Sequence, residues 1–108
     1  MNTVLKISAI AVCAFAMSVS VASAEDSAAT VYKAKCVMCH GATGDASTPA
    51  GKALKAPSFS SDAVLKESDA ALLEIEKNGK GKMPAWHDKL SENQLKDLVA
   101  YIHSLQKK

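Results

Sequence analysis

Cys36-Val37-Met38-Cys39-His40 is the most informative segment of this chain of 108 residues. On a turn of helix, Cys36 and Cys39 stand three positions apart and share a face, so their sulfurs can bond the two vinyl groups on one side of a porphyrin. His40 stands four positions after Cys36, which brings its imidazole beneath the porphyrin plane, toward the iron. The C-x-x-C-H pattern therefore predicts one covalently attached haem c, with His40 as the proximal iron ligand.

A redox dithiol, a zinc site and coincidence fit this cysteine spacing less well. A thioredoxin-like redox motif needs a surrounding βαβ pattern, and the sequence shows no strand-like alternation. A zinc site needs a further Cys or His pair at ligand spacing, which His87 and His103 do not supply. With three Cys and three His in the chain, a chance match to C-x-x-C-H is rare.

Residues 1–24 have the features of a secretory signal peptide. Lys6 precedes an apolar stretch, and Ala22-Ser23-Ala24 is a small-residue cleavage site. Removal of residues 1–24 would leave residues 25–108 as one exported, periplasmic domain. Haem attachment outside the cytoplasm is consistent with such export.

Two further interpretations of the N-terminal stretch remain. An uncleaved membrane anchor over residues 7–24 would be about as long as the shortest spanning helices, but serines dilute its second half. A lipoprotein site at Cys13 is disfavoured because Val12 is bulky and apolar residues continue beyond the cysteine. We therefore expect no membrane span after cleavage.

Composition limits the class of protein. The chain has 13 Lys, no Arg and 11 acidic residues, for a net charge of +2, which excludes a strongly basic nucleic-acid binder. Its apolar fraction of 48% is too high for a disordered tail. Only 5% of the residues are aromatic, so helices alone would make a thin core, which a haem would fill.

Hydrophobic periodicity predicts three main helices. The first runs from near Ser27 through the cysteine segment to His40, and the second spans 69–77 after an N-cap at Ser68. The third spans 92–106 and begins with a capping box of Ser91 and Gln94. Its apolar stripe consists of Leu95, Leu98, Val99, Ile102 and Leu105.

The segments between these helices are predicted to be largely irregular. Residues 41–59 are rich in Gly, Thr, Ser, Pro and Lys and are expected to form a loop. Residues 62–66 carry a weak signal for a short helical turn. The expected fold is therefore all-α, with three main helices and loops wrapped around one haem.

Met83 is the predicted distal iron ligand. After removal of residues 1–24 only Met38 and Met83 remain, and Met38 lies between the tethered cysteines and cannot reach the opposite face. Pro84 favours an extended backbone at Met83, and nearby glycines let the loop approach a flat cofactor. His87 is the second candidate ligand, whereas His103 is expected at the surface.

The sequence resembles the class I c-type cytochromes, small monohaem electron carriers with His and Met axial ligands. The resemblance covers nearly all of residues 25–108 and rests on the cysteine segment, on residues 78–86 (N-G-K-G-K-M-P-A-W) and on the last helix. It implies that Ala28 and Tyr32 of the first helix pack against Tyr101 of the last.

The resemblance also implies supporting residues around the haem. In the family a proline carbonyl accepts a hydrogen bond from the proximal histidine, a role expected for Pro57, with Pro49 as the alternative. Trp86 is expected either to pack at the haem edge or donate to a propionate, or to be an ordinary core aromatic.

The implied function is transfer of single electrons through a six-coordinate haem c, by a monomer that meets redox partner proteins in the periplasm. The alternative is a small haem c peroxidase or a gas or redox sensor, in which Met83 is displaced from the iron. Partners are expected to dock near Lys77, Lys80 and Lys82, while Glu74 and Glu76 on the preceding helix could be oriented away. The alternative is that these lysines only keep a solvated face soluble, since the total charge is near zero.

Overall fold

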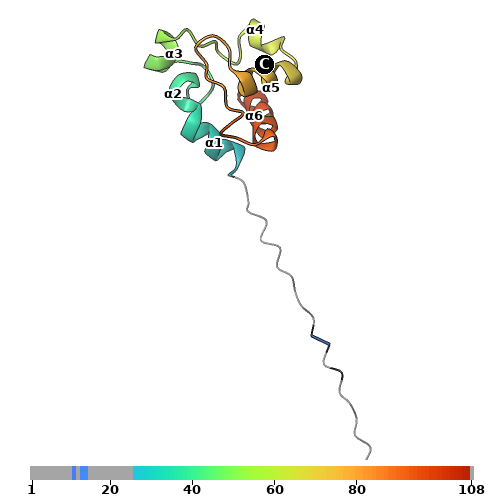
Figure 1. Ribbon diagram of the computed structural model, residues 1–108. Coiled ribbons are helices and arrows are strands. Elements are labelled where there is room, and N and C mark those ends of the chain that lie inside the picture. The colour runs from blue at the N-terminus through green and yellow to red at the C-terminus, as the bar shows by residue number, and fades with distance from the viewer. Residues whose placement is uncertain (1–10, 12, 15–25, 108) are drawn as a thin grey trace, which may run out of the picture.

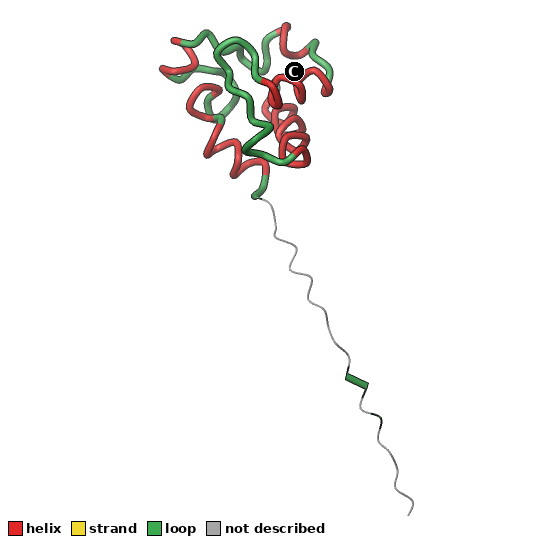
Figure 2. The backbone as a smooth tube through the Cα atoms, viewed as in Figure 1, coloured by secondary structure: helices red, strands yellow, loops and turns green. Residues whose placement is uncertain are grey.

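The computed structural model describes residues 11, 13–14 and 26–107 (Figure 1). Apart from residues 11, 13 and 14, the predicted signal peptide lies outside the described residues. The described part contains α1 (Ala28–Lys35), α2 (Val37–His40), α3 (Pro49–Ala53), α4 (Asp62–Leu65), α5 (Asp69–Asn78) and α6 (Glu92–Leu105). Figure 2 shows these helices joined by loops, with no strand in the described chain. None of the described helices is long and apolar enough to cross a membrane.

Short polar side chains start most of these helices. The side chain of Ser68 accepts a hydrogen bond from the backbone N–H of Ala71 at the start of α5. At the start of α6, Ser91 and Gln94 form the predicted capping box, in which each side chain accepts a hydrogen bond from the other residue's backbone. The predictions for α5, α6 and the short α4 are therefore confirmed.

The first predicted helix is divided in two. Cys36 ends α1 with a φ of −116°, far from the helical value of about −63°, and α2 begins at the next residue. The cysteine segment therefore occupies a separate helical turn, and α1 forms a helix of its own before it.

The prediction that residues 41–59 form only a loop is wrong at α3. Thr48 accepts a hydrogen bond from Gly51 N–H, and Pro49 occupies the first turn, where its missing N–H costs nothing. The Thr-Pro pair is thus a helix start, although the composition of the segment is typical of a loop.

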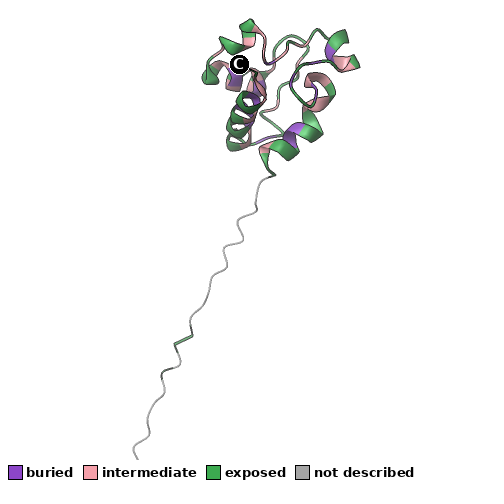
Figure 3. Ribbon diagram, turned by 180° about the vertical axis from the view of Figure 1, so that it is seen from behind, coloured by how far each residue is buried: buried purple, intermediate pink, exposed green. Residues whose placement is uncertain are grey.

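The core forms where α1 packs on α6. Tyr32 is almost fully buried, and its ring centroid lies 5.0 Å from that of Tyr101, as the resemblance implied. Ala28 also packs against this core. Figure 3 shows buried segments on α1 and α6. The clustered buried residues are Val31, Tyr32, Phe59, Leu90, Leu95, Leu98 and Ile102.

Candidate functional site

Cys39 and His40 of α2 line the wall of one cavity, together with Cys36, the N-cap residue of that helix. Backbone N–H groups of Cys39 and His40 donate to the Cys36 carbonyl at 3.2 and 2.9 Å, which fixes the turn. The two cysteines are free thiols and do not form a disulfide with each other. Both sulfurs are therefore available to bond a ligand in the cavity.

Two hydroxyl groups hold the C-terminal end of this turn. The Tyr32 hydroxyl donates to the Gly41 carbonyl at 2.6 Å, in a buried hydrogen bond. The Thr48 hydroxyl lies 2.6 Å from the Met38 carbonyl, to which it donates, and 3.2 Å from that of Cys39. Because the last carbonyls of a helix lack partners within it, these contacts stabilise α2 from α1 and α3.

Met83 reaches the same cavity from the loop after α5. Lys80 and Met83 exchange backbone hydrogen bonds of 3.2 and 3.0 Å, which close a tight turn. Gly79 precedes the turn with a φ of +77°, and a Cβ there would lie 2.5 Å from the Met83 carbonyl oxygen. In Figure 1 this loop, drawn in orange, crosses the view between the α2–α3 side and the α5–α6 side.

The cavity has a volume of about 430 Å³ and a mainly apolar wall. This volume is typical of sites that enclose a small molecule. Its apolar residues include Leu72, Ile75, Leu90, Leu95, Leu98 and Ile102. A flat, largely apolar cofactor with one iron atom fits such a wall.

The environment of His40 suits an iron ligand. Phe59 stacks on the His40 imidazole, with the ring centroids 4.7 Å apart. Burial lowers the pKa of His40 below its ordinary value of 6.5, so the ring is neutral, and neutral imidazole is the form that binds metals. Nδ1 of His40 is buried and lacks a hydrogen-bond partner among the described residues.

The hydrogen bond from His40 to a proline carbonyl, implied by the resemblance, is thus not formed in this structure. Pro57 lines the cavity, whereas Pro49 starts α3 and is not among the described lining residues. The position of Pro57 favours it over Pro49. The role of either proline stays a prediction.

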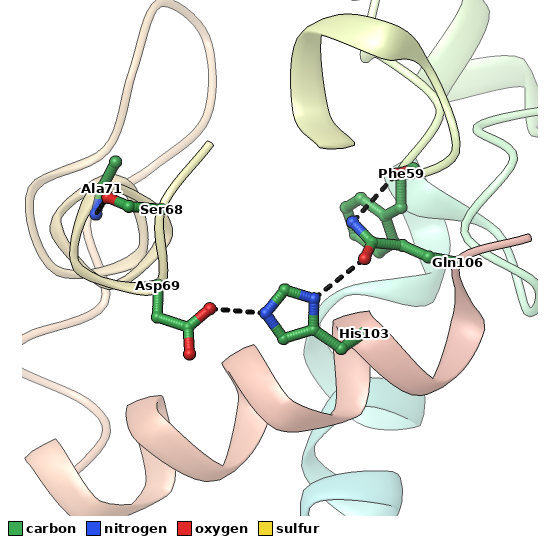
Figure 4. Close-up of polar contacts among 6 residues, drawn as sticks. All are labelled: Phe59, Ser68, Asp69, Ala71, His103 and Gln106. Carbon is green, nitrogen blue, oxygen red and sulfur yellow. Dashed lines mark hydrogen bonds and ion pairs between the residues drawn. The ribbon is translucent and has the colours of Figure 1, made fainter. Parts of the chain in front are cut away.

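The other two histidines lie outside the cavity wall. His87 is exposed and lies 2.9 Å from Asp88 Oδ1. The His103 Nε2 atom lies 2.6 Å from Asp69 Oδ1, and its Nδ1 lies 2.8 Å from Gln106 Oε1 (Figure 4). Gln106 in turn donates to the Phe59 carbonyl at 3.1 Å, so His103 belongs to a surface network that holds Phe59 in place behind His40.

Trp86 lines the cavity and packs against the core. The Nζ atoms of Lys35 and Lys89 lie 5.7 and 5.3 Å from the centre of its ring. Its position is compatible with contact to a cofactor edge and with a role as a core aromatic. Its predicted role therefore stays a prediction.

Sequence reasoning missed Glu76. The expectation that Glu76 points away from the lysine loop into solvent is wrong. Glu76 is only 5% exposed, and its side chain lies at the cavity. Glu74, by contrast, is exposed. A signal was present, since Glu76 stands four positions after Leu72 and so shares the buried face of α5.

Comparison with known proteins identifies the family. Residues 23–102 match the family described as "Cytochrome C oxidase, cbb3-type, subunit III". The chain belongs to the c-type cytochromes. It is a small class I member, as the resemblance indicated, and it carries covalently bound haem c.

Individual relatives agree with this family. A cbb3-type cytochrome c oxidase subunit CcoP of Azospirillum brasilense is 35% identical over 78% of this chain. The chain spans only 29% of that subunit's length. A cytochrome c6 of Thermostichus vulcanus is 31% identical over 91% of this chain and 87% of its own length.

A solved structure has the same fold. The structure titled "KustC0563 c-type cytochrome" superposes with a TM-score of 0.70 and 27% identity. The match covers 76% of this chain and all of that one. The architecture is therefore the all-α cytochrome c fold.

Proposed function

We propose that this cytochrome carries single electrons in the periplasm, with its haem attached to Cys36 and Cys39 and its iron held between His40 and Met83. One observation supports this assignment above the others. The four side chains come from α2, from Cys36 at its N-cap and from the loop after α5, yet all line one cavity. Bound there, a haem with two protein ligands would gain and lose one electron.

The protein would control this chemistry through its side chains. Met83 as second ligand raises the reduction potential and leaves no open iron position for a substrate. The apolar wall excludes water, which disfavours the extra charge of the oxidised iron. Phe59 fixes the plane of the His40 ring by stacking. Pro57 and Trp86 complete the surroundings that we assign to the haem.

The cellular setting is part of the same proposal. Residues 1–24 act as the export signal, and residues 25–108 form a monomeric periplasmic domain. Its partners are redox proteins that meet it briefly, since weak redox encounters use small interfaces. The relatives' names include both a subunit of a cytochrome c oxidase and a cytochrome c6.

Carbon monoxide distinguishes the proposed carrier from a small haem c peroxidase or a gas or redox sensor. The reduced wild-type holoprotein should have a six-coordinate, low-spin visible spectrum that carbon monoxide does not change. Ready binding of carbon monoxide would show that Met83 does not hold the sixth position, and would favour an enzyme or a sensor.

Replacement of each methionine tests the ligand assignment. Met83→Ala should open one iron position, admit carbon monoxide and lower the reduction potential. Met38→Ala is the matched control, because Met38 is 77% exposed and is not one of the described residues at the cavity. An unchanged spectrum and potential in Met83→Ala would transfer the assignment to His87.

A further inference from the structure

Glu76 is the only buried charged residue in the described part of the chain. Carboxylates are almost never fully buried without a partner. The Oε2 atom of Glu76 is buried and has no hydrogen-bond partner among the described residues. The side chain lines the cavity that we assign to the haem.

The fold holds Glu76 firmly in this position. Glu76 lies on α5, on the same face as the buried Leu72. The backbone N–H of Trp86 donates to the Glu76 carbonyl at 3.0 Å, which ties the loop containing Met83 to the same residue. The backbone at Glu76 is therefore fixed both by α5 and by the loop that carries Met83.

No positive side chain neutralises this carboxylate. Among the described residues no lysine forms an ion pair with Glu76. The other titratable groups around the cavity are Tyr32, Lys35, Cys36, Cys39, His40, Lys55, Glu67, Lys80 and Lys82. The four lysines in this group are exposed, so water screens their charge.

Two pKa shifts agree with this geometry. Burial raises the pKa of Glu76 to about 8. Burial also raises the pKa of the Cys36 thiol to about 11, and the negative charge of Glu76 contributes to that increase. Glu76 and Cys36 line the same cavity, so a charge on the carboxylate acts at the attachment site of the haem.

We propose that Glu76 takes up one proton from solvent when this cytochrome is reduced and releases it on oxidation. The inference rests on the proposed electron-carrier function. One electron comes from a redox partner, one proton from water adds to the Glu76 carboxylate, and no other bond forms or breaks. The net charge of the buried site then stays constant, because the proton replaces the positive charge that reduction removes, and the carboxylate is not left uncompensated in a medium of low dielectric constant.

The test measures the reduction potential of the holoprotein against pH. A tenfold change in proton concentration is worth about 59 mV for a one-electron couple. The wild-type potential should fall as pH rises through the neutral to alkaline range, with a slope that approaches this value. Glu76→Gln keeps the size of the side chain but cannot ionise, so its potential should be higher at alkaline pH and nearly independent of pH there.

Glu67→Gln is the matched control, because Glu67 lies at the same cavity but is half-buried. It removes the same charge and should keep the wild-type slope. Redox-difference infrared spectra give a second measurement. Reduction of the wild type should produce the band of a protonated carboxyl, and Glu76→Gln should lack it.

An unchanged slope in Glu76→Gln, or an infrared band that persists in it, would overturn the proposal. If Glu76 stays protonated in both redox states, the wild type itself should show neither the slope nor the infrared band, and the proposal would be overturned as well. These results would leave the proposed ligands intact, provided that the spectrum stays six-coordinate. Binding of carbon monoxide to the wild type would instead contradict the proposed function.

Discussion

Tyr32 connects the core to the cysteine segment through one side chain. Its ring packs between Phe59 and Tyr101, with centroid distances of 6.3 and 5.0 Å. Its hydroxyl donates to the Gly41 carbonyl directly after His40. Burial raises the pKa of Tyr32 far above its ordinary value of 10, so the hydroxyl keeps its proton and remains a donor.

Tyr32→Phe should therefore destabilise the holoprotein. The loss of a buried hydrogen bond costs about 1–3 kcal/mol. Gly41 keeps a second donor, the backbone N–H of Gly44 at 3.2 Å, so we expect about 1 kcal/mol. Urea unfolding measures the change. Tyr101→Phe, at a half-buried residue, should cost less than about 0.5 kcal/mol; equal losses in the two variants would contradict the role of the Tyr32 hydroxyl.

Residue types and spacing predicted much of the site, but not all of it. The C-x-x-C-H segment placed Cys36, Cys39 and His40 on one turn because helical geometry is local. Nothing local predicted that Phe59 stacks on His40, since the two meet only through tertiary packing. Glu76 was misjudged because a carboxylate is normally expected in water, although its spacing from Leu72 placed it on the buried face.

At the scale of elements, the caps predicted the starts of two helices correctly. Ser68 and Ser91 begin α5 and α6 where the sequence placed their starts. The Thr48 side chain caps α3 in the same way, but this helix was not predicted, because the glycine and lysine content of the segment is typical of a loop. The break at Cys36 could not be predicted, because apolar periodicity runs through it without interruption.

The turn that carries Met83 gives a prediction about backbone shape. Gly79→Ala places a Cβ 2.5 Å from the Met83 carbonyl at a φ of +77°, so the loop must move. The Cβ of Gly81→Ala would meet nothing within 4 Å. This variant should lose only roughly 1–2 kcal/mol of stability, because its φ of +57° places alanine in the left-handed conformation. Only Gly79→Ala should displace Met83 and admit carbon monoxide.

Visible spectra of the two reduced glycine variants under carbon monoxide provide the measurement. Urea unfolding should show a larger loss for Gly79→Ala than for Gly81→Ala. Equal sensitivity to carbon monoxide would mean that the close approach of Gly79 to Met83 does not position the ligand.

At the scale of the whole molecule, lysines surround the cavity in which the haem is expected. Lys35, Lys55, Lys80 and Lys82 all contribute to its wall and are exposed, and Glu67 is the only half-buried acid among the described lining residues. The expected cluster of Lys77 with Lys80 and Lys82 needs one correction. Lys77 lies 3.6 Å from Glu92 and forms an ion pair with it.

This arrangement predicts electrostatic steering of an acidic redox partner toward the cavity. Lys80→Glu with Lys82→Glu reverses two charges on the loop that carries Met83, and should slow association at low ionic strength. Lys96→Glu with Lys107→Glu is the control, because it makes the same change in net charge at exposed residues outside the cavity wall. Stopped-flow measurement of electron transfer to an acidic redox protein gives the rate.

The dependence on ionic strength distinguishes a loss of electrostatic steering from a displacement of Met83. The difference between the two double variants should shrink as ionic strength rises, because charges are screened beyond about 10 Å at 0.1 M salt. A defect in Lys80→Glu with Lys82→Glu that persists at high salt would indicate displacement of Met83. Equal low-salt rates in both double variants would show that partners dock elsewhere or through apolar contacts, since net charge alone would then account for the effect.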